Sequence, residues 1–86
     1  MQSKLVKQVA PKYPKEAKKK HIEGVVRLNI VIDHDGKVIE TNLRSGDPVL
    51  ANAAVEAVRE WRYKPTLLNG KPIEVQTEVD VNFHLH

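Results

Sequence analysis

Three features are scarce in this sequence, and each scarcity excludes a class of protein. There is no cysteine, so neither a disulfide framework nor a thiolate zinc site reinforces the fold. Only four of the 86 residues are aromatic, which leaves few platforms for stacking single-stranded nucleic acid. Long apolar runs are missing too: the stretch 25–32 is interrupted by Arg27, whereas a membrane span needs about 20 apolar residues. One modest core in a single domain must therefore supply the stability.

Charge is distributed unevenly along the chain. Residues 1–22 carry seven lysines and one glutamate, a net charge of +6, and the remaining 64 residues sum to −3. The basic segment ends in the run Lys18-Lys19-Lys20, a kind of run that binds nucleic acid or anionic lipid in some proteins. No aromatic residue interrupts the run, so a solvated helix face is favoured and no nucleic-acid partner is expected.

The first half of the chain predicts a helix followed by a hairpin. Proline suits the first helical position, so a short helix should begin at Pro14 and run to Lys20. Residues 25–32 are dominated by β-branched side chains and predict a strand. A turn signal at 33–36 then returns the chain into a second strand over 38–44. The face of that strand predicted to be apolar consists of Ile39, Thr41 and Leu43.

A second helix follows the hairpin. Asp47-Pro48 opens it, because aspartate caps a helix and proline fits the first turn. Apolar residues then recur at helical spacing. They are Leu50, Ala53, Ala54, Ala57, Val58 and Trp61. Since Trp61 ends this stripe, a core position is favoured over a role as an interface anchor. Pro65 stops the helical region, and Asn69-Gly70 marks another turn.

The last segment has the clearest pattern. From Glu74 to His86, apolar and polar residues alternate strictly with no Gly or Pro, which predicts a long strand with one buried face. A helix links the second and last strands, so these two should run parallel through a right-handed crossover. We therefore expect an α+β fold of order α-β-β-α-β. Its three-stranded antiparallel or mixed sheet has order 2-1-3 with two helices on one face, and the last strand lies at an edge.

Candidate metal ligands are few. His84 and His86 lie two residues apart on one strand face, a spacing that can chelate, but no third ligand accompanies them. Asp33 and Asp35 with Gly36 resemble a calcium loop only faintly, because the chain does not supply the later ligands that such a loop needs. A plain turn and solvated histidines are the favoured interpretations, so we expect no metal and no cofactor.

Catalytic arrangements are equally weak. Glu78 and Asp80 are neighbouring carboxylates on one strand face, but a regular strand implies no pocket for acid–base work. The two serines, Ser3 and Ser45, have no histidine near them in sequence, and no phosphate-binding glycine loop is present. The chain is therefore not expected to be an enzyme.

Several short motifs gain weight when they are taken in order. They are Pro11-Lys12-Tyr13-Pro14, Ile22-Glu23-Gly24-Val25-Val26, Asp35-Gly36-Lys37-Val38, Trp61-Arg62-Tyr63-Lys64-Pro65 and Asn69-Gly70-Lys71-Pro72-Ile73. Any one of them is weak, whereas the ordered set is specific. From about Val9 to Leu85 the chain resembles the C-terminal domain of TonB energy-transducing proteins.

The resemblance implies a docking function in the periplasm. Members are anchored in the inner membrane by an N-terminal helix that a Pro-rich spacer follows, and they pass energy from the ExbB–ExbD motor to outer-membrane receptors. The domain adds the receptor's TonB box as a strand beside its own last strand. Neither anchor nor spacer nor signal peptide occurs here, so we expect a fragment of a longer protein. Residues 1–12 would be an extended arm and residues 9–86 the TonB-like domain.

We accordingly predict a peptide-binding site along the last strand. Its residues are Gln76, Thr77, Glu78, Val79, Asp80, Val81, Asn82 and Phe83. Exposed edges are usually blunted with Lys or Pro, and residues 73–86 contain neither. Three alternatives remain open: a homodimer partner covers this edge, the domain serves as an interaction module in another envelope protein, or it binds nucleic acid.

The segment before the first predicted helix offers a second contact with the partner. Well-studied transporters have Gln-Pro just before the Tyr-Pro pair, whereas this chain has Ala10-Pro11. We expect a secondary partner contact through Ala10, Pro11 and Tyr13.

Overall fold

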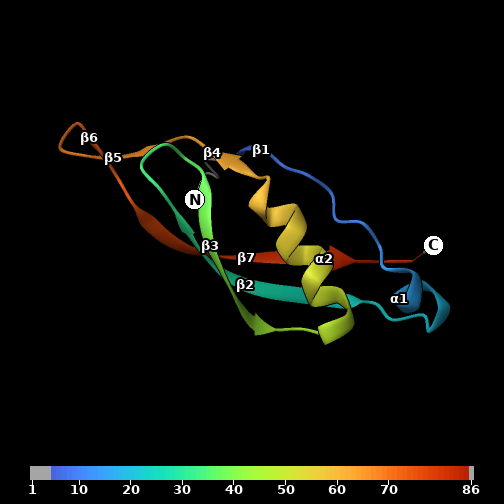
Figure 1. Cartoon of the computed structure of the whole chain (residues 1–86). Helices are drawn as coiled ribbons and strands as arrows, with labels where there is room; N and C mark the ends of the chain where they lie inside the picture. The colour runs from blue at the N-terminus through green and yellow to red at the C-terminus, as the bar shows by residue number, and fades with distance from the viewer. Residues whose placement is uncertain (1–4, 86) are drawn as a thin grey trace.

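The structure is a computed structural model that describes residues 5–85. Two helices and seven strands follow one another along the chain (Figure 1). In order they are β1 (Leu5–Lys7), α1 (Lys15–Lys19), β2 (Gly24–Ile32), β3 (Val38–Ser45), α2 (Pro48–Arg59), β4 (Arg62–Tyr63), β5 (Thr66–Leu68), β6 (Lys71–Ile73) and β7 (Val75–Phe83).

The main sheet has three strands in the order β3-β2-β7. Strand β2 pairs antiparallel with both neighbours, so β3 and β7 run in the same direction on either side of it. This arrangement confirms the predicted 2-1-3 order and the predicted edge position of the last strand. Strand β7 stops at Phe83, short of the predicted end at His86, because Phe83 already pairs with Gly24, the first residue of β2. His86 lies outside the described residues.

The core lies between one face of this sheet and α2, which crosses it (Figure 1). Residues directly opposite each other in a sheet share a face, so the register joins the apolar positions of β2 to those of β7. The sheet contributes Val26, Leu28, Ile30, Ile32, Val81 and Phe83, and the helical side contributes Ala17, Leu50, Ala54, Val58 and Trp61. Trp61 is only 4% exposed, which confirms its predicted core position.

Helix α2 begins as its sequence predicts. The Asp47 carboxylate accepts a hydrogen bond from the Val49 N–H at 2.8 Å, and Pro48 takes the first helical position. Such a cap contributes about 1 kcal/mol to helix stability. Helix α1 is one residue shorter than predicted at each end, with Pro14 just before it in an extended conformation and Lys20 just after it. It packs beside α2 at one end of the molecule.

Strand β3 differs from its predicted pattern at one end. The pairing register shifts between Val31 and Ile32, which face Glu40 and Val38. Ile39 is the extra residue at this irregularity, and it is 54% exposed. The prediction that Ile39 shares the apolar face with Thr41 and Leu43 is therefore wrong, because an inserted residue moves its neighbours to the other face.

Four short strands were not predicted from the sequence. Strand β1 lies within the predicted arm and pairs antiparallel with β4. Strands β5 and β6 form a hairpin around Asn69-Gly70, where both residues have positive φ, as the predicted turn requires.

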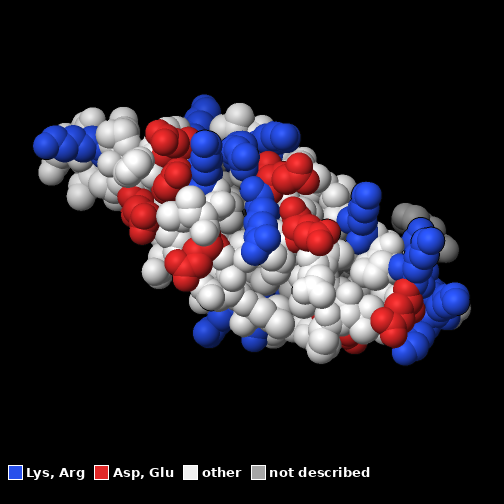
Figure 2. Space-filling model, viewed as in Figure 1, with Lys and Arg blue, Asp and Glu red and all other residues white. Residues whose placement is uncertain are grey.

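The molecule is elongated, with principal extents of 50 × 21 × 21 Å. The β5–β6 hairpin projects at one end and α1 lies at the other (Figure 1). Figure 2 shows Lys and Arg side chains gathered at the α1 end, as the basic sequence there requires. Among residues 5–85, no helix is long and apolar enough to cross a membrane.

Candidate docking site on the sheet edge

The predicted site occupies β7, the outermost strand on one side of the main sheet. Nine consecutive residues, Val75 to Phe83, pair with β2 without any shift in register. No strand within residues 5–85 pairs with the opposite side of β7. An edge of this kind offers a regular row of main-chain N–H and C=O groups to another extended chain. All eight residues predicted for peptide binding lie on this strand.

Alternate side chains anchor β7 in the core. Val81 and Phe83 are each 3% exposed, and Val75 and Val79 are partly buried against the same cluster. Thr77, which lies opposite Ile30, is exposed. The strand is therefore held more firmly at its C-terminal half than at its N-terminal half.

The other face of β7 is polar and is organised by one arginine from β2. The Arg27 Nε donates a hydrogen bond to Asp80 Oδ1 at 2.9 Å and lies 3.8 Å from Glu78 Oε1. The bond to Asp80, together with the charges of both carboxylates, raises the pKa of the Arg27 guanidinium. All three side chains are about half exposed (49%), so the pairing contributes modestly to stability. The two carboxylates thus belong to a surface ion-pair network on a regular strand.

Sequence reasoning missed Arg27 as a partner of these carboxylates. The sequence shows Arg27 as a polar residue within an apolar strand, but it does not show which residue pairs with Arg27, because that depends on the register between β2 and β7. Only an antiparallel register that sets Arg27 opposite Asp80 brings the three charges together.

The N-terminal arm reaches the C-terminal end of β7 through one of its three predicted contact residues. Tyr13 donates a hydrogen bond from its hydroxyl to the Ile22 carbonyl, and its ring meets Phe83 edge-on at a centroid distance of 5.5 Å. Burial, with the charge of Glu23 added, raises the pKa of the Tyr13 hydroxyl. Ala10 is exposed and Pro11 half-buried. Tyr13 is therefore placed to support the C-terminal end of β7.

A second hydrogen bond holds the arm farther along. The Trp61 Nε1 donates to the Val9 carbonyl at 2.9 Å. From there the arm continues past α2 to β1, which pairs with β4 (Figure 1). The conformation of residues 5–13 is thus tied to the core at both ends.

The candidate metal ligands have structural roles. His84 Nδ1 lies 3.0 Å from Glu23 Oε1, which also accepts a hydrogen bond from the Leu85 N–H at 3.0 Å. Asp33 Oδ1 accepts hydrogen bonds from the N–H groups of Asp35 and Lys37, both at 2.9 Å. These bonds, the one from Lys37 foremost, lower the pKa of Asp33 and close the turn. Nowhere in the described part of the chain do three His, Cys, Asp or Glu side chains gather in a way that could hold a metal ion.

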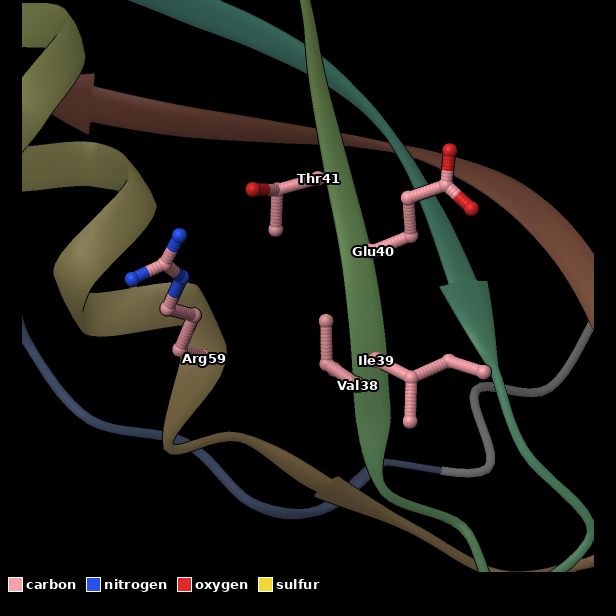
Figure 3. Close-up of a pocket in the computed structure, with 5 residues that line it drawn as sticks. All are labelled: Val38, Ile39, Glu40, Thr41 and Arg59. Atoms are coloured by element: carbon pink, nitrogen blue, oxygen red, sulfur yellow. The ribbon is translucent and has the colours of Figure 1, made fainter.

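A pocket of about 390 Å³ lies on the opposite edge of the sheet, between β3 and the last turn of α2. Its lining residues are Val38, Ile39, Glu40, Thr41 and Arg59. In Figure 3, Val38 and Thr41 point toward Arg59, whereas Ile39 and Glu40 point to the other side of β3. The strand β2 separates this pocket from β7.

Comparison with known sequences finds relatives that all belong to one family. The family model for the Gram-negative bacterial TonB protein C-terminal region matches residues 9–85. Protein TonB of Vibrio cholerae is 36% identical over 80 residues, which cover 91% of this chain and 33% of the relative. Protein TonB of Xanthomonas campestris pv. campestris is 34% identical over 80 residues, covering 88% and 35%. The chain therefore spans about a third of the length of the curated relatives it matches.

Solved structures share the fold. The solution NMR structure of the Pseudomonas aeruginosa TonB CTD superimposes with a TM-score of 0.77 at 25% identity, covering 95% of this chain and 85% of that one. The TonB2 protein from Vibrio anguillarum gives a TM-score of 0.69 at 33% identity, covering 99% and 83%. Both likenesses cover nearly the whole of this chain.

Proposed function

Because the chain belongs to the Gram-negative bacterial TonB protein C-terminal family, we propose that it is the receptor-docking domain of a TonB-type energy transducer. Its activity is binding, and it makes or breaks no covalent bond. The domain works in the periplasm, and the region that precedes it in the parent protein anchors in the inner membrane and contacts ExbB and ExbD. The coupled process is uptake through an outer-membrane receptor driven by the proton-motive force.

The mode of binding that we propose is strand addition to β7. One observation carries it: β7 is a nine-residue end strand with a regular register and no lysine or proline to block pairing. A TonB box from the receptor would extend the sheet by one strand through main-chain hydrogen bonds. The contact residues are the eight from Gln76 to Phe83.

The expected affinity is weak to moderate. Each main-chain hydrogen bond contributes about 0.5–1.5 kcal/mol net, and the ordering of a flexible peptide opposes the four or five bonds available. Because the main chain supplies most of the binding, the side chains of β7 need not match one receptor sequence. Glu78→Ala should therefore change the affinity only modestly, whereas Val79→Pro should change it more if it removes an outward-facing donor.

An amide chemical-shift titration of the isotopically labelled domain tests the proposal. The probe is a synthetic peptide copied from the TonB box of an outer-membrane receptor. The largest shifts should fall on Gln76 to Phe83, with smaller ones on β2. The matched control is the same peptide with a central proline, which cannot complete the ladder and should bind more weakly.

Two results would contradict strand addition to β7. In one, the largest shifts cluster on Lys18 to Lys20 of α1 while Gln76 to Phe83 stay unchanged. In the other, analytical ultracentrifugation detects a tight dimer whose interface is this edge. A dimer would favour the homodimer alternative, because a partner copy would then occupy the main-chain groups that the peptide needs.

A further inference from the structure

The strand at the opposite edge, β3, also lacks a neighbour. Within residues 5–85 its ladder partner is β2, and β4 touches only the residues just before it: Lys37 forms a single β-bridge with Arg62, and the Tyr63 N–H donates to the Gly36 carbonyl at 2.9 Å. Like β7 it contains no lysine or proline. Ile39 is 54% exposed and Leu43 49% exposed, whereas none of the strongly exposed large hydrophobic residues of the described chain lies on β7. Natural edges normally hide such positions or place charges beside them, as Glu40 and Arg44 do here, so a partner of this edge must match both the apolar and the charged side chains.

The pocket beside β3 adds a specific chemical feature. It places Arg59, from the last turn of α2, on the same side of the strand as Val38 and Thr41 (Figure 3). The Arg59 side chain is exposed, and its guanidinium forms no ion pair or hydrogen bond with any residue of the described chain. A guanidinium is a rigid fork of donors suited to a carboxylate, so a free one beside an open strand edge favours an acidic ligand.

We propose that β3 is a second strand-addition site, which takes an extended peptide with one acidic side chain directed at Arg59. Alternate side chains of an added strand point to opposite faces of the sheet. Those on the helix-covered face would lie beside Val38 and Thr41 and would bring the carboxylate to Arg59. Those on the other face would lie beside Ile39 and Glu40, where apolar or neutral residues fit and an acidic one would be repelled.

The irregular register of β3 explains why peptide binding at this edge needs the Arg59 side chain in addition to main-chain hydrogen bonds. Pairing shifts occur near both ends of the strand, so the main-chain groups are not evenly spaced along its whole length. Such bulges re-aim side chains and interrupt a ladder. A peptide on β3 therefore gains fewer main-chain bonds than one on β7, and the Arg59 contact supplies the missing selectivity.

The proposal goes beyond receptor docking, since it does not depend on an occupied β7. The two edges are separated by β2 alone, about 10 Å from β3 to β7. Peptides added on opposite sides of one sheet do not overlap. The domain could then hold a receptor segment on β7 and an acidic segment of another protein on β3 at the same time.

The test is a peptide titration followed by amide chemical shifts. The probe is a capped hexapeptide of alternating valine and threonine with one central glutamate, and its matched control has glutamine at that position. With β7 already saturated by a TonB-box peptide, the glutamate probe should shift residues 38–45 and Arg59. It should bind about two- to fivefold more tightly than the glutamine probe. In Arg59→Gln the two probes should bind equally, and the glutamine probe should be unaffected by the substitution.

Several outcomes would overturn the proposal. One is that the probes shift only residues 75–83 of the peptide-free domain. Another is that glutamate and glutamine probes bind β3 equally in the wild type, or that no shift appears at 38–45 up to several millimolar probe. A dimer in ultracentrifugation with β3 as its interface would assign this edge to a second copy instead. Lys15→Gln, on the remote helix α1, serves as the charge control and should leave the preference for glutamate intact.

Discussion

Strands β3 and β7 flank the same central strand, yet they make different edges. Strand β7 pairs along nine residues without a shift and exposes a polar face of Gln76, Glu78, Asp80 and Asn82. Strand β3 shifts register near both ends and exposes Ile39 and Leu43. Neither contains lysine or proline.

The regularity of a sheet edge decides which kind of peptide it can bind. A regular edge offers evenly spaced main-chain groups, so it suits a peptide recognised by its backbone and tolerates varied side chains. A shifted edge offers fewer such groups and must add a side-chain contact, here Arg59 beside the pocket. We therefore expect β7 to be the more permissive edge and β3 the more selective one.

The largest effect on stability should come from Leu28 of the central strand β2, which lies between the two edge strands. Leu28 is completely buried and lies opposite Leu43 of β3 and Val79 of β7. Leu28→Ala leaves a cavity beneath both edges, so it should lower the free energy of unfolding by about 3–5 kcal/mol. Urea denaturation measures the loss. The control Leu67→Ala, at a position 58% exposed, should cost less than about 0.5 kcal/mol, and equal losses in the two variants would contradict the shared core.

The next largest effect on stability should come from Gly36 and should disturb β3 more than β7. Gly36, in the turn that leads into β3, has φ +88°, and a Cβ there would lie 1.9 Å from the Tyr63 carbonyl oxygen. Gly36→Ala should cost at least about 2 kcal/mol, because strain at positive φ adds to that clash. Gly70→Ala is the matched control: its φ is +80° with no atom near the added Cβ, so only about 1 kcal/mol of strain is expected. Chemical shifts of Gly36→Ala should change along β3 more than along β7.

Much of this architecture could be predicted from the sequence. Strict alternation from residue 74 onward located β7, and the Asp47-Pro48 pair located the start of α2. The helix between the last two long strands fixed the sheet order, because a crossover places β2 in the middle. The strand β7 and its edge position could therefore be predicted, because strict alternation is a local pattern of the sequence.

The irregular register of β3 and the position of Arg59 beside it could not be predicted from local periodicity. The bulge at Ile39 depends on how β3 registers against β2, and periodicity alone carries no register. Arg59 belongs to α2 and not to β3, so only the packing of α2 places its side chain at the same pocket as the β3 residues. The short strands β1 and β4 were missed for a similar reason: their pairing joins segments more than fifty residues apart.

Acid should destabilise the turn that leads into β3, because the Asp33 carboxylate closes this turn. Its pKa is lowered by hydrogen bonds from the turn, so its stabilising contribution is complete above the unfolded-state pKa and is lost as the pH falls through the folded-state value. Asp33→Asn should be less stable than the wild type at pH 7, and the difference should shrink below about pH 4. Urea midpoints across pH 2–7 measure this. Asp35→Asn, whose carboxylate closes no turn, is the control, and a constant difference for Asp33→Asn at every pH would contradict the assignment.

The smallest effect should come from the ion pairs on the polar face of β7. Arg27→Gln removes the cation between Asp80 and Glu78, so the two carboxylates repel each other without compensation. Because all three side chains are about half exposed, the urea midpoint should fall only slightly at low salt. At 1 M salt, where the Debye length is about 3 Å, the difference from the wild type should nearly vanish. Arg59→Gln is the matched control on the β3 edge: this arginine makes no ion pair within residues 5–85, so its small effect should not depend on salt. A salt-independent loss in Arg27→Gln would mean that the packing of its side chain, and not its charge, supports β7.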